Sequence, residues 1–211
     1  MKIAIIGPTG MAGRAVYKEA LIRGHQVTGF VRNPERAVKL LGKGNFIKKS
    51  IYQIASVNLA DFDVVINAFA NHENPIENFD ALAHLLRVAR GLKTRFIFLM
   101  GAASLERQDG KMLLDSLSEL PNNEAWIREP RYGVDELYVL QHDNEGVNWT
   151  AISPQQDFLN GPKSEYITGR NNLIYAADGK SHISTGNMAT AILNEIEEPR
   201  FINQRFTVGD K

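Results

Sequence analysis

The sequence predicts an α/β fold built on a doubly wound parallel sheet, with a small C-terminal cap region. Short apolar runs alternate with amphipathic helical patterns along the chain, as they do where helices cover a parallel sheet. The runs are apolar throughout rather than at alternate positions, which indicates strands that are buried on both faces. Because crossovers between parallel strands are right-handed, few topologies remain, and the Rossmann type is the simplest of them.

The first half of the chain contains strand and helix signals that follow one another closely. Residues 2–6 read KIAII, a pattern typical of a buried strand, and residues 11–24 form an amphipathic helical pattern that ends at Gly24. Asn33 is a suitable N-cap for a second helix, and Pro34 is a suitable first helical residue. We expect three further strands and one further helix, at residues 25–31, 46–51 and 63–70 and at residues 74–91.

The second half of the chain has its clearest signals near its two ends. A strand at residues 95–100 is followed by a polar stretch with many helix breakers, which reaches Pro130. We then expect a helix, a strand, a hairpin-like region, a helix and a final strand, at residues 134–146, 147–153, 165–179, 186–198 and 204–209. We expect residues 1–211 to form a single domain, in which residues 154–185 contribute a cap on the substrate side.

The composition excludes several classes of function. Lysine plus arginine equals aspartate plus glutamate, 24 against 24, so the chain has no excess positive charge for nucleic acid or an anionic membrane. The absence of cysteine excludes disulfides, thiolate zinc sites and a cysteine nucleophile, and the five histidines show no metal-ligand spacing. No run reaches the roughly 18 apolar residues of a membrane helix. We therefore expect a cytoplasmic protein that acts on a small molecule, and we leave a homodimer open.

A glycine-rich turn joins the first expected strand to the first expected helix. Gly7, Gly10 and Gly13 lie in the segment GPTGMAG, and this context is typical of a dinucleotide site. Gly7 permits a sharp exit from the strand, Gly10 lets the backbone approach a diphosphate, and Gly13 lets the helix pack close to the sheet. The free amides at the start of the helix would hold the anion. A tight turn without a ligand is the alternative.

The end of the second expected strand indicates which dinucleotide binds. Enzymes that use NAD carry a carboxylate here, which accepts hydrogen bonds from the ribose 2′-hydroxyl. This strand ends in the segment FVRN, so the carboxylate is missing. Arg32 and Arg36 lie one helical turn apart, and guanidinium groups suit a 2′-phosphate. The sequence therefore predicts NADP(H) in preference to NAD(H), with two solvated surface arginines as the alternative.

Two later strand ends are expected to contact the rest of the cofactor, because ligands lie beyond the carboxyl ends of the strands. Small residues after the fourth strand would let the adenosine half lie against the backbone. We expect contacts there from Ala68, Phe69 and Ala70. After the fifth strand, Met100 and Gly101 would approach the nicotinamide half. Ordinary strand-to-loop turns are the alternative at both places.

The catalytic groups of a carbonyl reductase are missing. Short-chain reductases protonate the carbonyl with a tyrosine that a lysine assists four residues later, but here Glu136 follows Tyr132 and His142 follows Tyr138. A flavin needs no strong protein acid, because its added charge is delocalised over the ring and its proton can come from water. The missing groups favour a flavin-like acceptor over a simple ketone, and they equally favour no reaction at all.

Four motifs in the second half of the chain carry a family resemblance: WTAISP, GRNNLI, GKSHIS and RFTVG. Together with the glycine-rich front end, they make the chain similar to the bacterial NADH-flavin reductases, a branch of the atypical short-chain dehydrogenase/reductase proteins. More distantly, the chain resembles biliverdin-IXβ/flavin reductase and the NmrA-like proteins. The resemblance implies a Rossmann domain that binds NAD(P).

The resemblance also implies roles for individual residues. Ser104 stands where such reductases carry a serine near the nicotinamide, and it would orient the reacting end. Pro154 and Gln155 follow the sixth strand, where the nicotinamide amide is held. The diphosphate would be held by Gly7, Thr9, Gly10, Met11 and Ala12, and the adenosine phosphate by Arg32.

Three functions remain open at this stage. The leading one is an NADP(H)-dependent reductase that passes hydride to a flavin or a similar conjugated acceptor, with the flavin as substrate rather than prosthetic group. The alternative is a non-enzymatic, NADP(H)-binding redox sensor of the NmrA-like type, which signals through a partner protein. An epimerase or isomerase is the third, and the missing Tyr-x-x-x-Lys counts against it. Residues 105–131 would lie over the ring-binding site, as a mobile lid or as a packed surface helix.

Overall fold

The computed structural model describes residues 1–211, in which strands and helices alternate along most of the chain. The first half contains β1 (Lys2–Ile6), α1 (Met11–Ile22), β2 (Gln26–Val31), α2 (Pro34–Leu41), β3 (Asn45–Lys48), a 3-10 turn (Ile51–Gln53), α3 (Ser56–Leu59), β4 (Val64–Asn67), α4 (Ile76–Ala89) and β5 (Arg95–Leu99). The second half contains α5 (Leu113–Glu119), α6 (Arg128–His142), β6 (Asn148–Ser153), β7 (Asp157–Leu159), β8 (Tyr166–Gly169), β9 (His182–Ser184), α7 (Thr185–Glu197) and β10 (Gln204–Asp210).

Six parallel strands form the part of the sheet that the sequence predicts. Their order is β3-β2-β1-β4-β5-β6, so the chain builds outwards from β1 and then, in the other direction, from β4. In this register Ile3 of β1 lies between Val27 of β2 and Val64 of β4. This is the strand order of a doubly wound sheet, so the predicted fold class is confirmed. The order reverses between β1 and β4, and ligands of such sheets bind at the carboxyl ends of the strands there.

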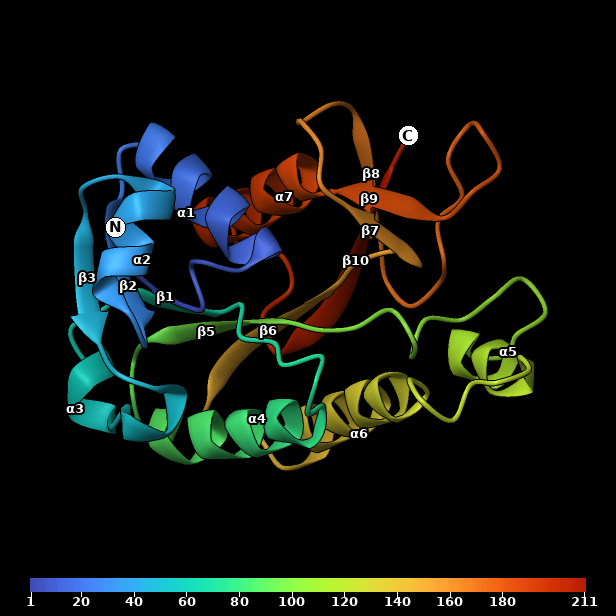
Figure 1. Ribbon diagram of the computed structural model, residues 1–211, viewed down its shortest axis with the longest axis horizontal. Coiled ribbons are helices and arrows are strands. Elements are labelled where there is room, and N and C mark those ends of the chain that lie inside the picture. Colours follow the sequence, from blue (N-terminus) through green and yellow to red (C-terminus); the bar gives the residue numbers. More distant parts are fainter.

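Helices cover both faces of this sheet, as Figure 1 shows. Alternate residues of a strand point to opposite faces, and β1 supplies both cores in this way. Ile3 and Ile5 pack with α1 and α7, whereas Ala4 and Ile6 pack with α3, α4 and α6. Every residue of β1 after Lys2 is therefore buried, which explains why the strand reads as apolar throughout.

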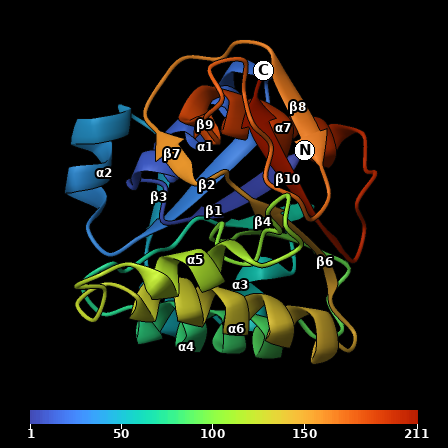
Figure 2. The same cartoon turned by 90° about the vertical axis from the view of Figure 1, so that its right-hand side faces the viewer.

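The last third of the chain extends the sheet beyond β6, and here one expectation is wrong. β10 pairs parallel with β6, and β8 pairs antiparallel with β10 as the outermost strand. The hairpin expected within residues 165–179 does not form, because β8 pairs its backbone with a strand from the very end of the chain. β7 and β9 form a separate parallel pair. Figure 2 shows these strands on the side of the sheet that carries α1 and α7.

The start of α6 also differs from expectation. The helix begins at Arg128 rather than at residue 134, and Pro130 lies in its first turn. Proline is tolerated there because the amides of the first turn have no partner within the helix. By contrast, Asn33 caps α2 and Pro34 is its first residue, as predicted. No helix combines the length and the apolar character that crossing a bilayer requires.

A buried ion pair joins the sheet to α7. The guanidinium of Arg95, at the start of β5, donates hydrogen bonds to the carboxylate of Glu195 and, at 2.9 Å, to its backbone carbonyl. The same carboxylate accepts hydrogen bonds from the backbone amides of Arg200 and Phe201. Both charged groups are almost inaccessible to solvent, so the charge of each is neutralised by the other rather than by water.

Candidate dinucleotide and substrate site

Two glycines of the turn between β1 and α1 are required by the protein's own backbone. Gly7 has a φ of +78°, and a Cβ atom there would lie 2.8 Å from the carbonyl oxygen of Ala68. A Cβ atom at Gly13 would lie 2.2 Å from the carbonyl oxygen of Gly7. The turn therefore lies directly against the end of β4, and α1 lies directly against the turn. A side chain at either position would push one of these elements away.

Gly10 has no such structural reason. Its φ is −71°, which any residue adopts, and a Cβ atom would lie no closer than 3.5 Å to another atom. The residue is also exposed. The missing side chain therefore leaves open surface at the start of α1, where a ligand can approach the backbone closely.

The amides beside this open surface have no hydrogen-bond partner within the protein. α1 begins at Met11, its N-cap Gly10 has no side chain, and the amides of Met11, Ala12 and Gly13 donate to nothing. The side chains of Asn33 and Ser184 cap the starts of α2 and α7. Free amides and the partial positive charge of the helix start suit an anion such as a diphosphate. Thr9, a further expected contact, is half-buried beside Gly10.

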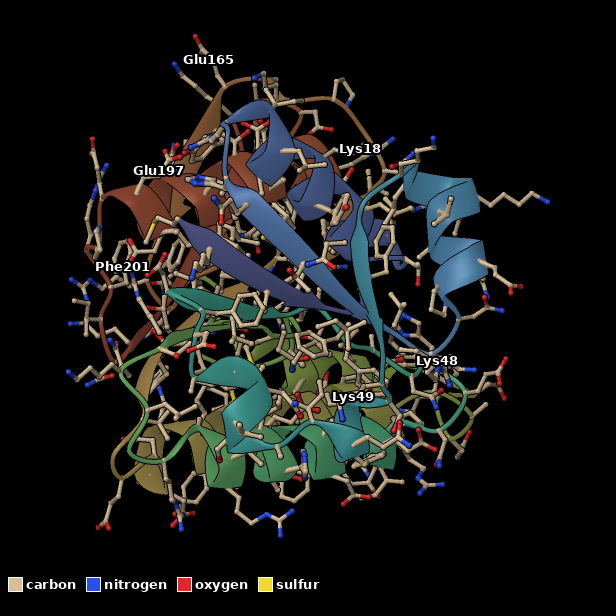
Figure 3. All side chains as sticks on the ribbon, turned by 90° about the vertical axis from the view of Figure 1, so that its left-hand side faces the viewer. Lys18, Lys48, Lys49, Glu165, Glu197 and Phe201 are labelled. Carbon is tan, nitrogen blue, oxygen red and sulfur yellow. The ribbon has the colours of Figure 1, made fainter.

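Four basic residues gather at the carboxyl ends of β2 and β3. Arg32 and Arg36 are exposed, and neither forms an ion pair or donates a side-chain hydrogen bond. The pairing of the two strands places Lys48 opposite Val31, and the amide of Lys49 donates to the Val31 carbonyl at 3.0 Å. Figure 3 shows Lys48 close to the loop between β2 and α2. Sequence reasoning missed both lysines, because only the strand pairing brings them beside Arg32.

The ends of β4 and β5 line the other part of this edge. Ala68 lies against Gly7, Ala68 and Phe69 are half-buried, and Ala70 is exposed. After β5, Met100 is buried and Gly101 is exposed. The structure thus brings the expected residues of the turn, β4 and β5 to one edge of the sheet, since all three strands are parallel and adjacent.

Gln155 does not reach this surface, although it was expected from the sequence to contact the ligand. Its exposed fraction is 0%, and both ends of its side-chain amide are engaged within the protein. The nitrogen donates to Thr207 at 2.7 Å, and the oxygen accepts from the amide of Ile174 and the hydroxyl of Ser181. Gln155 therefore ties the end of β6 to β10 and to the loop before β9. Pro154 is also buried.

Ser104 lies in the turn after β5, where a buried arginine donates a hydrogen bond to it. Its Oγ accepts a hydrogen bond of 3.2 Å from Nη1 of Arg205, and 8% of the residue is exposed. Arg205 also donates to the hydroxyl of Ser153, the side chain of Asn171 and the Ser104 carbonyl. Sequence reasoning missed Arg205. The available signal was a charged residue beside the buried apolar positions of a strand, Phe206 and Val208.

Arg205 carries a buried positive charge that no carboxylate neutralises directly. Only 6% of the residue is exposed, and all of its hydrogen-bond partners are neutral. Burial lowers the pKa of Arg205 to about 10, and the negative charge of Glu106 partly opposes this shift. Arg205 thus stays protonated at neutral pH. Arg95, the comparable buried arginine, is paired with Glu195 instead.

Neither Tyr132 nor Tyr138 is hydrogen-bonded to a lysine. Tyr132 lies on α6 with its hydroxyl 3.5 Å from the guanidinium of Arg128. Tyr138 is largely exposed and stacks on the ring of His142 at 4.2 Å.

Glu136, also on α6, has no hydrogen-bond partner. Its burial, and to a smaller extent the negative charges of Glu129 and Asp135, raise its pKa to about 7. No cluster of three or more histidine, aspartate or glutamate side chains could hold a metal ion.

Residues 105–131 contain a helix that is packed at its start. Leu113, at the beginning of α5, forms a small core with Leu105 and Leu173. Backbone hydrogen bonds of 2.8 and 2.9 Å join Leu113 to Leu105 and Leu114 to Ala103. Of the two expectations for this segment, these contacts favour the packed surface helix. Figure 2 shows α5 on the side of the sheet that carries α4 and α6, opposite the strands β7 and β9.

Comparisons with known proteins agree with this arrangement. The sequence profile of a family described as NAD(P)H-binding matches residues 7–199, from the glycine turn to the end of α7. The uncharacterized Bacillus subtilis protein YwnB is 33% identical over 216 residues, which cover 99% of this chain and 98% of that protein.

Two crystal structures resemble the whole chain as well. A Lactobacillus casei protein is 36% identical with a TM-score of 0.92, over 100% of this chain and 99% of that one. A "putative NADH-flavin reductase" from Streptococcus pneumoniae is 30% identical with a TM-score of 0.87, over 100% of both chains. The similarity therefore includes the C-terminal strands as well as the nucleotide-binding half.

Proposed function

This chain belongs to the NAD(P)H-binding family, as the resemblance noted in its sequence predicted, and from that premise we propose that it is an NADP(H)-dependent reductase. The acceptor of the hydride would be a flavin or a similar conjugated ring. A relative that is 30% identical over its full length bears the name of an NADH-flavin reductase, which supports this class of acceptor.

One observation carries the proposal: the open, uncapped start of α1 lies where the strand order reverses. Gly7 and Gly13 are needed for packing, whereas no contact within the protein requires glycine at position 10, which supports a ligand that approaches the backbone there. The free amides of Met11, Ala12 and Gly13 would donate to the oxygens of a diphosphate. From there the adenosine half would extend towards β2 and β4, and the nicotinamide half towards β5.

The basic residues after β2 and β3 support NADP(H) over NAD(H). Arg32 and Arg36 have no partner within the protein, so their guanidinium groups are free to bind a 2′-phosphate. Lys48 and Lys49 add positive charge beside them, although Lys49 also donates to the carbonyl of Gln53 at 3.3 Å. No carboxylate stands at the end of β2, where it would bind a free ribose 2′-hydroxyl.

In the proposed reaction the residues of this chain bind and orient rather than exchange protons. NADPH would supply the hydride, with its two electrons, and water would supply the proton that completes the reduced acceptor. Ser104 would orient the reacting ends of the two rings at the end of β5. Met100 and Gly101 would let the rings lie close to the backbone. Hydride transfer between stacked rings depends mainly on their orientation, so it needs no proton donor from the protein. The missing tyrosine–lysine pair agrees with such a reaction.

Titration calorimetry and a steady-state assay test the proposal together. We expect NADPH to bind at least tenfold more tightly than NADH, and we expect NADPH to be oxidised when riboflavin or FMN is added. Failure to bind either nucleotide would refute the dinucleotide site. Equal affinities would refute only the proposed site for the 2′-phosphate.

A redox sensor is the second candidate function, and the absence of a catalytic acid favours it. A sensor needs only the nucleotide site and a surface for a partner protein. Binding of NADPH without oxidation in the presence of riboflavin, FMN or FAD would select this function. The same result would refute the reductase.

A further inference from the structure

We propose that Arg205 is a positioning residue that turns the Ser104 hydroxyl into a hydrogen-bond donor for the negative charge that develops on the hydride acceptor. The proposal rests on the reductase function and identifies how the site would stabilise a reduced, anionic ring. Arg205 itself would not touch the substrate.

All the N–H hydrogens of the Arg205 guanidinium are engaged within the protein. A guanidinium group has five N–H donors and no acceptor. Nε donates to Asn171, Nη1 donates to Ser104 and Ser153, and Nη2 donates to Asn171 and the carbonyl of Ser104. Each hydrogen thus has one acceptor within the protein, and Arg205 is buried. Its positive charge can reach a ligand only through one of these partners.

Ser104 is the partner through which this charge can reach a ligand. A serine hydroxyl offers one hydrogen and two lone pairs. One lone pair of Ser104 accepts the hydrogen of Arg205, which fixes the oxygen, and the hydroxyl hydrogen has no acceptor within the protein. Ser153 receives the same donor at the same 3.2 Å, but none of its surface is exposed. Ser104, in the turn after β5, retains 8% exposure.

The effect of Arg205 on the Ser104 hydroxyl is electrostatic. A cation that donates to a hydroxyl oxygen draws electron density from the O–H bond and strengthens it as a donor, all the more where water is excluded. Arg205 has no carboxylate among its hydrogen-bond partners, so its charge is not neutralised by an ion pair. Arg95 shows the structural alternative, since Glu195 neutralises it directly. A preorganised donor of this kind favours an acceptor that becomes anionic on reduction.

A double-mutant cycle tests the proposal, with anaerobic stopped-flow measurement of hydride transfer from NADPH to riboflavin. We expect Ser104→Ala and Arg205→Met each to slow the transfer by about 10- to 100-fold, since each removes the same donor. The KM for NADPH should change by less than about threefold, because the diphosphate site is intact. Adding Arg205→Met to Ser104→Ala should slow the reaction by no more than about threefold further.

Two control variants separate this role from a structural one. Ser153→Ala removes the matched but inaccessible partner and should stay within about threefold of the wild type. Arg205→Lys keeps the charge and should restore part of the rate that Arg205→Met loses. Thermal melting of each variant reports whether it folds, and Arg205→Gln, which also removes the charge, replaces Arg205→Met in the cycle if the latter does not fold.

The outcomes are distinguishable. Equal, independent losses from the two substitutions would overturn the proposal, because they would show that Arg205 acts without Ser104. A normal rate for Ser104→Ala would overturn it as well. Both results would leave the reductase function intact. A wild-type protein that does not reduce riboflavin, FMN or FAD would overturn the reductase and this inference with it.

Discussion

Replacing Gly10 with serine should separate the binding of NADPH from the stability of the protein. Serine is a good N-cap residue, and its Oγ would accept a hydrogen bond from the amide of Ala12 or Gly13. These are the amides that the diphosphate is proposed to use. The new hydroxyl would therefore fill the open surface and compete for the same donors.

The structure sets the expected magnitudes. A Cβ atom at Gly10 lies 3.5 Å from its nearest neighbour, and the φ of −71° suits serine, so folding meets no obstacle. Glycine and serine differ at an N-cap by only a few tenths of a kcal/mol, or about 1 °C in the melting temperature. Losing one charge-assisted hydrogen bond costs about 1.5–3 kcal/mol. The Kd for NADPH should therefore rise by about 10- to 150-fold.

Titration calorimetry and thermal melting of three variants check this reasoning. Gly133→Ser is the matched control, because Gly133 lies on α6 with open space around it and away from the turn. It should leave the Kd unchanged. Gly13→Ala should instead lower the melting temperature by about 5–10 °C, because its Cβ atom would lie 2.2 Å from the carbonyl of Gly7. A Kd for Gly10→Ser within twofold of the wild type would refute the proposed diphosphate site.

Three further predictions concern charge. Arg32→Ala should weaken NADPH binding by about tenfold and leave NADH binding unchanged, because only NADPH carries the 2′-phosphate. Arg90 is also exposed, and Arg90→Ala is the control that should change neither affinity. If calorimetry shows that Arg32→Ala still prefers NADPH, the 2′-phosphate site is contradicted. Glu195→Gln should lower the free energy of unfolding by about 2–4 kcal/mol in urea titrations, because the buried guanidinium of Arg95 then has no carboxylate to neutralise it. A loss below about 1 kcal/mol would contradict this role of the ion pair. The pKa of Glu136 is raised from 4.5 in the unfolded chain to about 7 in the folded protein. Between these pH values the folded state binds a proton that the unfolded state has lost. The free energy of unfolding therefore falls as the pH rises from about 4.5 to 7. Glu136→Gln should therefore exceed the wild type by about 1–3 kcal/mol at high pH, with the difference closing at low pH; equal melting curves at both ends would contradict it.

Much of the fold could be predicted from the sequence because its signals are local. A strand buried on both faces reads as a short apolar run, and β1, β2, β4, β5 and β6 were expected within a few residues of their bounds. Gly13 is restricted by the carbonyl of Gly7 within the same strand–turn–helix unit, and Gly7 has a positive φ of its own, so the spacing of the glycines alone predicts the turn. The free amides at the start of α1 follow from the same unit.

Other parts of the candidate site depend on pairings between distant segments. The pairing of β2 with β3 brings Lys48 and Lys49 beside Arg32, and the position of β10 next to β6 brings Arg205 to Ser104. The same packing buries Gln155, which the sequence placed at the ligand. β8 likewise pairs with β10 rather than within a hairpin.

The sequence by itself therefore determined where the central strands of the sheet run and which turn leaves a helix start open, because backbone sterics and hydrophobic periodicity act over a few residues. Only the tertiary structure decided which side chains face that site and which are enclosed. The physical reason is that hydrogen bonds between strands, and the burial that follows from them, join residues as far apart in the chain as Ser104 and Arg205.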